Sequence, residues 1–272
     1  MRIRVVDAFT DQPFAGNPAG VCLLPAGPWP DETWMQLVAA EMKHAETAFA
    51  RPSDAEDADW DLRWFTPAVE VELCGHATLA TTHAMAADGL VDGKVRFSTR
   101  SGILTAEVGP DGAITLDFPA APPIAAEPPA GLAEALGAEP VAVYRTGSLG
   151  DLLSVLPDEK AVRAIAPDFA AVAQITTREE IRGLIVTAAA EDPKAGYDFV
   201  SRLFAPAYGI PEDPVTGSSH TVLAPYWAAR LGRDHLVGFQ ASARGGLLHV
   251  VPDGDRVLLT GRAVTVLDGT LL

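Results

Sequence analysis

The length, composition and charge of this sequence exclude several classes of protein. Its 272 residues suffice for two domains of ordinary size, and 48% hydrophobic against 21% charged residues is typical of a well-buried globular core. The formal net charge of −16 repels nucleic acid and anionic lipid, so neither is an expected partner, and an anionic substrate would need a local region of positive potential. Two cysteines cannot build a disulfide framework, which favours a cytoplasmic setting.

Strands and helices are predicted along the whole chain. Residues 1–9 are typical of a first strand, and no uncharged apolar run approaches the roughly 20 residues that cross a bilayer. Frequent glycine and proline favour antiparallel pairing. Strands are expected at residues 2–9, 19–24, 45–50, 61–66, 95–99, 103–108, 113–118, 141–145, 152–156, 183–187, 197–203, 236–240, 246–251 and 256–266. Helices are expected at residues 31–42, 76–88, 129–136, 158–164, 167–173, 178–181 and 218–231.

A proline-rich stretch near the middle of the chain predicts a domain boundary. Residues 118–129 lack hydrophobic periodicity, and their prolines donate no backbone hydrogen bonds. We therefore predict an N-terminal half at residues 1–118, joined by the last residues, about 263–272. The C-terminal half then covers residues 119–262.

Two segments on either side of that boundary are alike. Residues 74–87 and 216–229 each contain an early glycine, Gly75 or Gly217, and then a helix-length run without a formally charged side chain. A helix without a polar face belongs inside a domain. The pair is either two unrelated core helices or the sign of a duplicated domain, and the matching positions favour duplication. The expected fold is α+β, with two similar domains that each wrap strands round a central helix.

The starts of these two helices are candidate binding sites for an anion. The first backbone amides of a helix lack internal partners and carry a partial positive charge. Two such N-termini meeting between the domains would hold a carboxylate in an otherwise acidic protein. Gly75 and Gly217 would let a ligand approach the backbone closely.

Glu46 and His76 are the first candidates for chemistry. Glu46 lies among small and apolar residues, where partial desolvation would raise its pKa toward a range useful for proton transfer. It is otherwise an edge-strand glutamate facing water. His76 lies at a helix N-terminus, where the dipole favours a neutral ring, and it is either catalytic or a capping residue.

Asp213, Ser218 and Cys74 each have a functional and a structural interpretation. Asp213 opens an Asp-Pro turn and is either part of the site or a cap, and Ser218 is either an N-cap or a donor to substrate. Cys74, before a helix N-terminus, is either a base or nucleophile with a lowered pKa or a buried packing residue. Its counterpart in the second half is Thr216, so a mechanism with two thiols is unavailable.

Other common chemistries have little support in the sequence. The six histidines and two cysteines show no metal-ligand spacing, so no metal is expected, and His83 and His220 are predicted to be core residues. No glycine-rich nucleotide motif occurs, so the usual signatures of a nucleotide-binding site are absent.

Four motifs in chain order together resemble the PhzF-like phenazine-biosynthesis isomerase family. They are Phe-Ala-Gly-Asn-Pro-Ala at 14–19, Ala-Glu-Thr at 45–47, Cys-Gly-His-Ala-Thr at 74–78 and Asp-Pro-Val-Thr-Gly-Ser at 213–218. The resemblance implies the diaminopimelate-epimerase fold, in which the active site lies between two mostly antiparallel, barrel-like halves. It also implies isomerisation of a small carboxylate-bearing metabolite without metal or organic cofactor, in a homodimer.

The same resemblance implies roles for individual residues. Glu46 matches the proton-carrying glutamate, while His76, Asp213 and Ser218 match residues that orient the substrate. Gly75, Thr216, Gly217 and Ser219 would bind the substrate, the amides near the two glycines holding its carboxylate. Biosynthetic members tend to carry Gly-His-Pro where this chain has Gly75-His76-Ala77, so it is more similar to relatives whose substrates are unassigned.

Three functions therefore remain open from the sequence. The first is a cofactor-independent isomerase that depends on Glu46. The second is an amino-acid epimerase or racemase that uses Cys74, a position that resembles the epimerase cysteine. The third is a non-catalytic metabolite-binding protein that keeps the fold.

Overall fold

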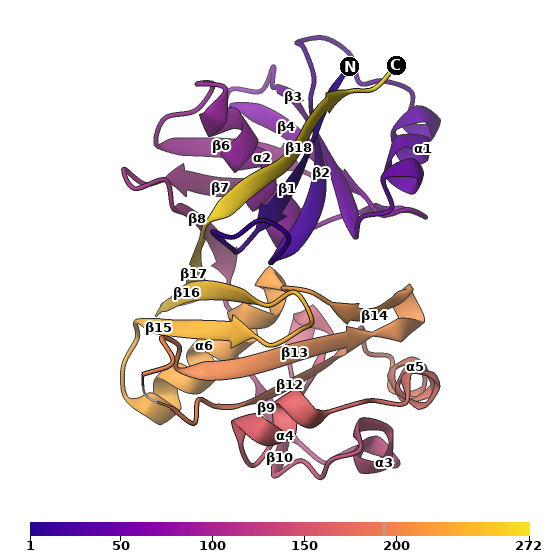
Figure 1. The fold of residues 1–272 in the computed structure, drawn as a ribbon, viewed down its shortest axis with the longest axis vertical. Coiled ribbons are helices and arrows are strands. Elements are labelled where there is room, and N and C mark those ends of the chain that lie inside the picture. The colour runs from indigo at the N-terminus through magenta and orange to yellow at the C-terminus, as the bar shows by residue number, and fades with distance from the viewer. Residues whose placement is uncertain (193) are drawn as a thin grey trace. The chain divides into compact units, whose positions relative to one another are not determined.

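The structure is a computed structural model that describes residues 1–192 and 194–272 (Figure 1). The chain forms two compact units, Met1–Phe118 with Leu258–Leu272, and Pro119–Val257. The sequence predicts two domains, at residues 1–118 with about 263–272 and at residues 119–262. Their identity with these two units stays a prediction. Among the described residues, no helix is both long and apolar enough to cross a membrane.

The first unit is a mixed sheet with two helices, α1 (Glu32–Met42) and α2 (Gly75–Ala87). Strand β1 lies between β2 and the C-terminal strand β18, antiparallel to both. Pairing continues from β2 through β3, β4, β6 and β7 to β8, and β8 also pairs with β17. The strands are β1 (Arg2–Ala8), β2 (Asn17–Leu23), β3 (Glu46–Pro52), β4 (Trp60–Phe65), β5 (Glu70–Val71), β6 (Lys94–Thr99), β7 (Gly102–Val108), β8 (Ile114–Pro119), β17 (Arg256–Gly261) and β18 (Ala263–Thr270).

The second unit is also a mixed sheet, in which pairing runs from β9 through β10, β11, β12, β13 and β15 to β16. Its strands are β9 (Ile124–Ala126), β10 (Ala142–Arg145), β11 (Leu152–Val155), β12 (Leu184–Ala189), β13 (Phe199–Ala205), β14 (Ile210–Asp213), β15 (Leu236–Gln240) and β16 (Gly246–Asp253). Its helices are α3 (Leu132–Leu136), α4 (Glu159–Ala164), α5 (Phe169–Arg178) and α6 (Gly217–Leu231), with 3₁₀ turns at Gly147–Leu149 and Pro206–Tyr208.

The two units repeat one order of strand pairings. In the first unit, antiparallel β1–β2 is followed by parallel β2–β3, antiparallel β3–β4, parallel β4–β6 and antiparallel β6–β7. The second unit repeats that alternation in β10–β11, β11–β12, β12–β13, β13–β15 and β15–β16. In each unit a short strand and then a long helix lie in the sequence between the two strands of the second parallel pair. They are β5 and α2 between β4 and β6, and β14 and α6 between β13 and β15. The duplicated α+β fold predicted from the sequence is confirmed.

The long helices α2 and α6 are the core helices of their units. Both are buried on every side over most of their length, as expected for helices without a charged face. In the first unit, α1 packs its Met35, Val38 and Ala39 against Phe49 and Phe65 of the sheet. In the second, α3, α4 and α5 cover strands β11 to β13 with another apolar cluster. Each unit therefore has one core helix and at least one further helix that packs against its sheet.

Some predicted elements differ from the structure. The predicted helix at 178–181 is wrong: α5 ends at Arg178, because Glu180 adopts a left-handed conformation (φ 54°) that stops the helix. The predicted strand at 256–266 is interrupted at Arg262 and forms β17 and β18. The predicted linker at 118–129 contains the strand β9, which pairs with β10, and the short strands β5 and β14 were not predicted.

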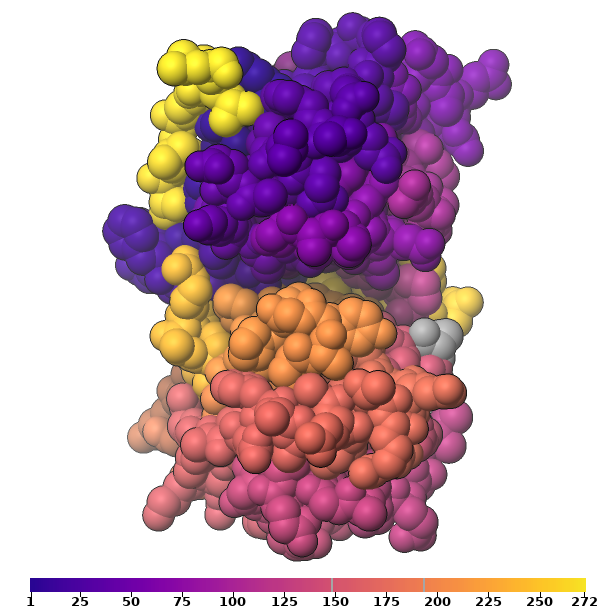
Figure 2. Space-filling model, turned by 90° about the vertical axis from the view of Figure 1, so that its right-hand side faces the viewer, coloured from indigo at the N-terminus to yellow at the C-terminus, as the bar shows by residue number. Residues whose placement is uncertain are grey.

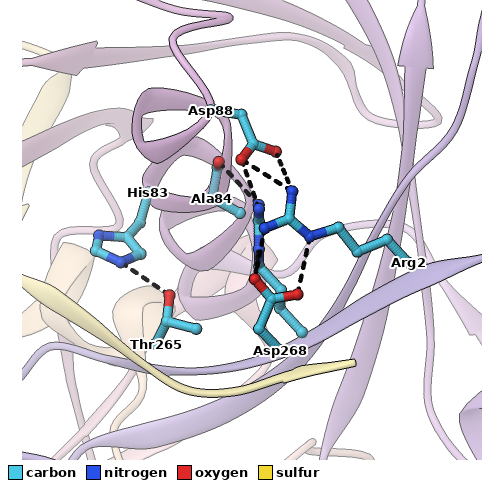
Figure 3. Close-up of polar contacts among 7 residues, drawn as sticks. Arg2, His83, Ala84, Asp88, Thr265 and Asp268 are labelled. Atoms are coloured by element: carbon cyan, nitrogen blue, oxygen red, sulfur yellow. Dashed lines mark hydrogen bonds and ion pairs between the residues drawn. The ribbon is translucent and has the colours of Figure 1, made fainter. Parts of the chain in front are cut away.

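A group of arginine–aspartate pairs joins the first and last strands to the core helix of the first unit. Figure 2 shows the yellow C-terminal residues on the surface beside indigo ones, in agreement with the β1–β18 pairing. Arg2 of β1 pairs with Asp88, which follows the last residue of α2, and with Asp268 of β18 (Figure 3). Arg4 of β1 pairs with the same two aspartates. Arg4 also donates to the carbonyl oxygen of Ala84 at 3.1 Å. A cation at a helix C-terminus is favourably placed relative to the dipole.

Candidate functional site

Glu46 is the first residue of β3, directly after the turn that ends α1. Lys43 ends that helix in a left-handed conformation (φ 55°), and the chain then enters the strand. Strand β3 runs parallel to β2, which places Glu46 opposite Ala19. The Glu46 side chain is only 12% exposed. It is therefore not the solvent-facing edge glutamate that was the alternative interpretation.

His76 lies next to this carboxyl group. It is the second residue of α2, and its Nε2 lies 3.3 Å from Oε2 of Glu46. The two atoms are close without being aligned as a hydrogen bond, and His76 Nε2 is buried without a hydrogen-bond partner among the described residues. Burial, assisted by the nearby His44, lowers the pKa of His76 to about 3. The ring is therefore neutral near pH 7, as the helix N-terminus predicted.

Cys74 completes this group of side chains. It is the N-cap residue of α2, but its side chain accepts no capping hydrogen bond. Its Sγ lies 3.5 Å from Nδ1 of His76. Glu46, Cys74 and His76 each offer one possible metal-ligand atom, and these three atoms lie within 4.8 Å of one another. In the described part of the chain, this is the one group of three such residues that could hold a metal ion. Their spacing of two residues does not by itself predict that Cys74 and His76 face each other.

In the second unit, Asp213 and Thr216 are held in place by Gln240. Asp213 ends β14, and Thr216 is the N-cap residue of α6, whose hydroxyl donates to Oδ2 of Asp213. The Gln240 side chain is buried and makes three hydrogen bonds. Its Oε1 accepts from the Thr216 amide at 2.8 Å, and its Nε2 donates to the Asp213 carbonyl oxygen at 2.8 Å and to the Thr216 hydroxyl at 3.1 Å. Neither Asp213 nor Ser218 is the N-cap residue.

Arg182 and Asp151 lie next to the start of α6, and sequence reasoning missed both. Nε and Nη2 of Arg182 donate to the two carboxylate oxygens of Asp151 at 2.9 and 2.5 Å, and Nη2 also donates to the Ser218 hydroxyl at 3.1 Å. Burial raises the pKa of Asp151, and the Arg182 guanidinium opposes that shift. Ser219 is buried, and its hydroxyl has no hydrogen-bond partner within residues 1–192 and 194–272.

The predicted site residues thus form one group in each unit. Glu46, Gly75 and His76 lie together in the first unit, with Cys74 beside them. Asp213, Thr216, Gly217, Ser218 and Ser219 lie at the start of α6 in the second unit. In the first group, a carboxyl group beside a neutral imidazole is able to accept and return a proton. In the second, hydroxyl groups, helix amides and a guanidinium can bind an anion.

Comparisons with known proteins agree with these observations. The family model described as "Phenazine biosynthesis-like protein" (PhzC-PhzF) matches residues 6–269. The chain is 47% identical to an uncharacterized isomerase of Pseudomonas aeruginosa, over 98% of this chain and 96% of that protein. It is 45% identical to an uncharacterized isomerase of Halalkalibacterium halodurans, over 99% of this chain and 98% of the relative.

Solved structures share the fold. A PhzF family protein of Enterococcus faecalis superposes with a TM-score of 0.90 at 37% identity, over 100% of this chain and 99% of that one. A hydroxyproline epimerase of Agrobacterium vitis has a TM-score of 0.61 at 16% identity, over 99% and 91%. That second likeness concerns the fold alone.

Proposed function

The chain belongs to the family of phenazine biosynthesis-like proteins and is an isomerase, and from this premise we propose that Glu46 moves a proton on a small carboxylate-bearing metabolite. The observation that carries the proposal is the 3.3 Å contact between the Glu46 carboxyl group and the buried His76 ring. Because the pKa of His76 is about 3, its ring stays neutral near pH 7 and does not take up the proton that Glu46 handles.

In this proposal the reaction needs no group beyond the side chains of the chain itself. The Glu46 carboxylate takes a proton from a substrate carbon, and the electron pair left behind is delocalised toward a neighbouring unsaturated group. The protonated Glu46 then returns the proton to a different carbon, which restores the carboxylate. In this proposal the buried His76 ring lies beside the Glu46 carboxyl group and limits its movement on one side.

We assign substrate binding to the start of the two core helices. The amides near Gly75 and Gly217 would hold the substrate carboxylate, with Thr216 and Ser219 as further contacts. Asp213 and Ser218 would orient the substrate, and Gln240 and Arg182 hold these residues in place through the hydrogen bonds already given. Three further features remain predictions: that the substrate lies between the two halves, that the protein is cytoplasmic, and that it is a homodimer, the last from the family resemblance alone.

The decisive experiment is a screen for exchange of carbon-bound hydrogen with deuterated water. Cyclic and amino-acid carboxylates would be incubated with wild type and with Glu46→Gln, and deuterium uptake followed by mass spectrometry. We expect a substrate for wild type and a loss of exchange of at least about 100-fold in the variant, because a general base contributes about 10²–10⁴-fold. Glu41→Gln, the same change at an exposed position of α1, is the matched control. Equal exchange by wild type and Glu46→Gln would refute the role of Glu46.

A second candidate function is an epimerase that uses the Cys74 thiol. The 3.5 Å contact between Cys74 Sγ and His76 Nδ1 favours it, because a histidine at that distance can activate a thiol. The variant Cys74→Ser separates the two functions. An isomerase that depends on Glu46 retains most of its exchange activity, whereas a thiol-dependent epimerase loses nearly all of it. Thiol alkylation of wild type provides an independent comparison.

A further inference from the structure

Three different metal-ligand types meet at the start of α2, and no part of the proposed proton transfer requires all three. They are the carboxylate of Glu46, the thiol of Cys74 and the imidazole of His76. We propose that they form a binding site for a thiophilic divalent cation such as Zn²⁺ or Cd²⁺, and that the bound ion blocks the isomerase reversibly. The blocking rests on the proposed function of Glu46, whereas the binding does not.

The distances between the donor atoms suit a tetrahedral ion. Bond lengths of about 2.3 Å to sulfur and about 2.0 Å to nitrogen or oxygen imply that neighbouring ligand atoms lie roughly 3.3–3.5 Å apart. Oε2 of Glu46 lies 3.3 Å from Nε2 of His76. The third donor, Sγ of Cys74, belongs to a set whose atoms lie within 4.8 Å of one another. The sulfur lies 3.5 Å from the other ring nitrogen, Nδ1, so coordination by all three donors requires the Cys74 side chain to rotate toward the Nε2 side of the ring.

The unused nitrogen of His76 is the second observation that points to a ligand. His76 is only 5% exposed, and its Nε2 is buried without a hydrogen-bond partner in the described chain. Leaving a buried polar atom unpaired is unfavourable, so an ion that coordinates its lone pair removes a cost already present in the structure. The same ion coordinates the Glu46 carboxylate, which can then no longer accept a proton from substrate.

The charges and the donor types select a soft divalent cation. Binding replaces the S–H bond of Cys74 with a metal–sulfur bond, and the proton passes to solvent. One thiolate and one carboxylate then neutralise the two positive charges, so no net charge is buried at the site. A thiolate at the N-cap of a helix is also stabilised by the dipole. Thiolate and imidazole ligands favour Zn²⁺ and Cd²⁺ over Mg²⁺ and Ca²⁺, which prefer oxygen.

The test is a Cd²⁺ titration of untagged protein, followed by the ultraviolet charge-transfer band of a cadmium thiolate. We expect about one Cd²⁺ per chain, competition by Zn²⁺, removal by EDTA and no effect of Mg²⁺. Cys74→Ala should abolish the band. Cys22→Ala, which changes the other cysteine within the core of β2, should leave it unchanged. His76→Gln and Glu46→Gln should each weaken Cd²⁺ binding at least tenfold, with folding verified by circular dichroism.

The outcomes separate this inference from the proposed function. Absence of the band in wild type, or its persistence in Cys74→Ala, overturns the metal site and leaves the isomerase proposal intact. If Cd²⁺ binds as expected but no tested carboxylate undergoes exchange, the binding site stands on its own. Where exchange is found, Zn²⁺ should reduce it and EDTA should restore it, and an exchange rate unaffected by saturating Zn²⁺ would contradict the blocking.

Discussion

Both core helices carry a buried histidine near their first turn, and burial keeps both rings neutral. In α2 this is His76, whose pKa is about 3. In α6 it is His220, whose Nδ1 donates to the carbonyl oxygen of Thr216 at 2.8 Å. Burial lowers the pKa of His220 to about 4, partly opposed by that hydrogen bond. The prediction that His220 is a core residue agrees with its complete burial, whereas His83 is only partly buried and contacts Thr265 at 3.2 Å (Figure 3).

At the residue scale, we predict that His220 makes the protein less stable in acid. Its pKa is about 6.5 when unfolded and about 4 when folded, so between these values the unfolded state binds more protons. The contribution is complete above pH 6.5 and is lost as the pH falls toward 4, by about 3 kcal/mol in all. Urea unfolding at pH 7, 5.5 and 4.5 should show a shallower pH dependence for His220→Gln than for wild type. Parallel curves would contradict the prediction.

At the scale of elements, one order of strand pairings serves two different sets of side chains. The helices α2 and α6 follow the short strands β5 and β14 in equivalent positions. Their N-cap residues are Cys74 and Thr216, and neither side chain caps its own helix. Cys74 contacts His76, whereas Thr216 contacts Asp213 and Gln240. The duplicated fold thus places a carboxyl group and an imidazole at one helix start, and hydroxyl groups with a guanidinium at the other.

The arginine–aspartate ion pairs that join β1 to β18 and to the end of α2 give a prediction with an internal control. Arg4 and Arg2 contact the same two aspartates, but their side chains are 5% and 54% exposed. Removing one partner of a buried ion pair costs about 3–5 kcal/mol, whereas an exposed pair contributes about 0–1 kcal/mol. We therefore expect Arg4→Met to lower the free energy of unfolding by about 3 kcal/mol, and Arg2→Met to lower it far less. Denaturant unfolding tests this, and equal losses would show that burial does not decide the effect.

At the scale of the whole molecule, the net charge of −16 sets the conditions under which association should be measured. Like charges on two chains repel, and salt at about 0.15 M screens them beyond about 8 Å. If the chain is a homodimer as the family resemblance implies, light scattering at that ionic strength should give twice the chain mass of 28.6 kDa. Dilution at low salt should shift the mass toward that of one chain. A mass of one chain under all conditions would refute the dimer.

The sequence by itself determined the elements whose signals are local. Uncharged runs bounded by glycines predict the two core helices, because burial of a helix depends on its own side-chain pattern. Most strands are likewise predicted near their positions in the structure. Glu46 and His76 were identified as candidates through motifs, and the structure brings them within 3.3 Å. Their catalytic roles stay predictions.

Only the tertiary structure decided the contacts between residues distant in sequence. Gln240 holds Thr216 across 24 positions, and Arg182 reaches Ser218 across 36, yet neither Gln240 nor Arg182 belongs to a recognisable local pattern. Parallel pairs such as β13–β15 enclose an entire helix, so their register depends on how that helix packs. The contact between Cys74 and His76 likewise depends on side-chain rotation at the start of α2, which sequence spacing does not define.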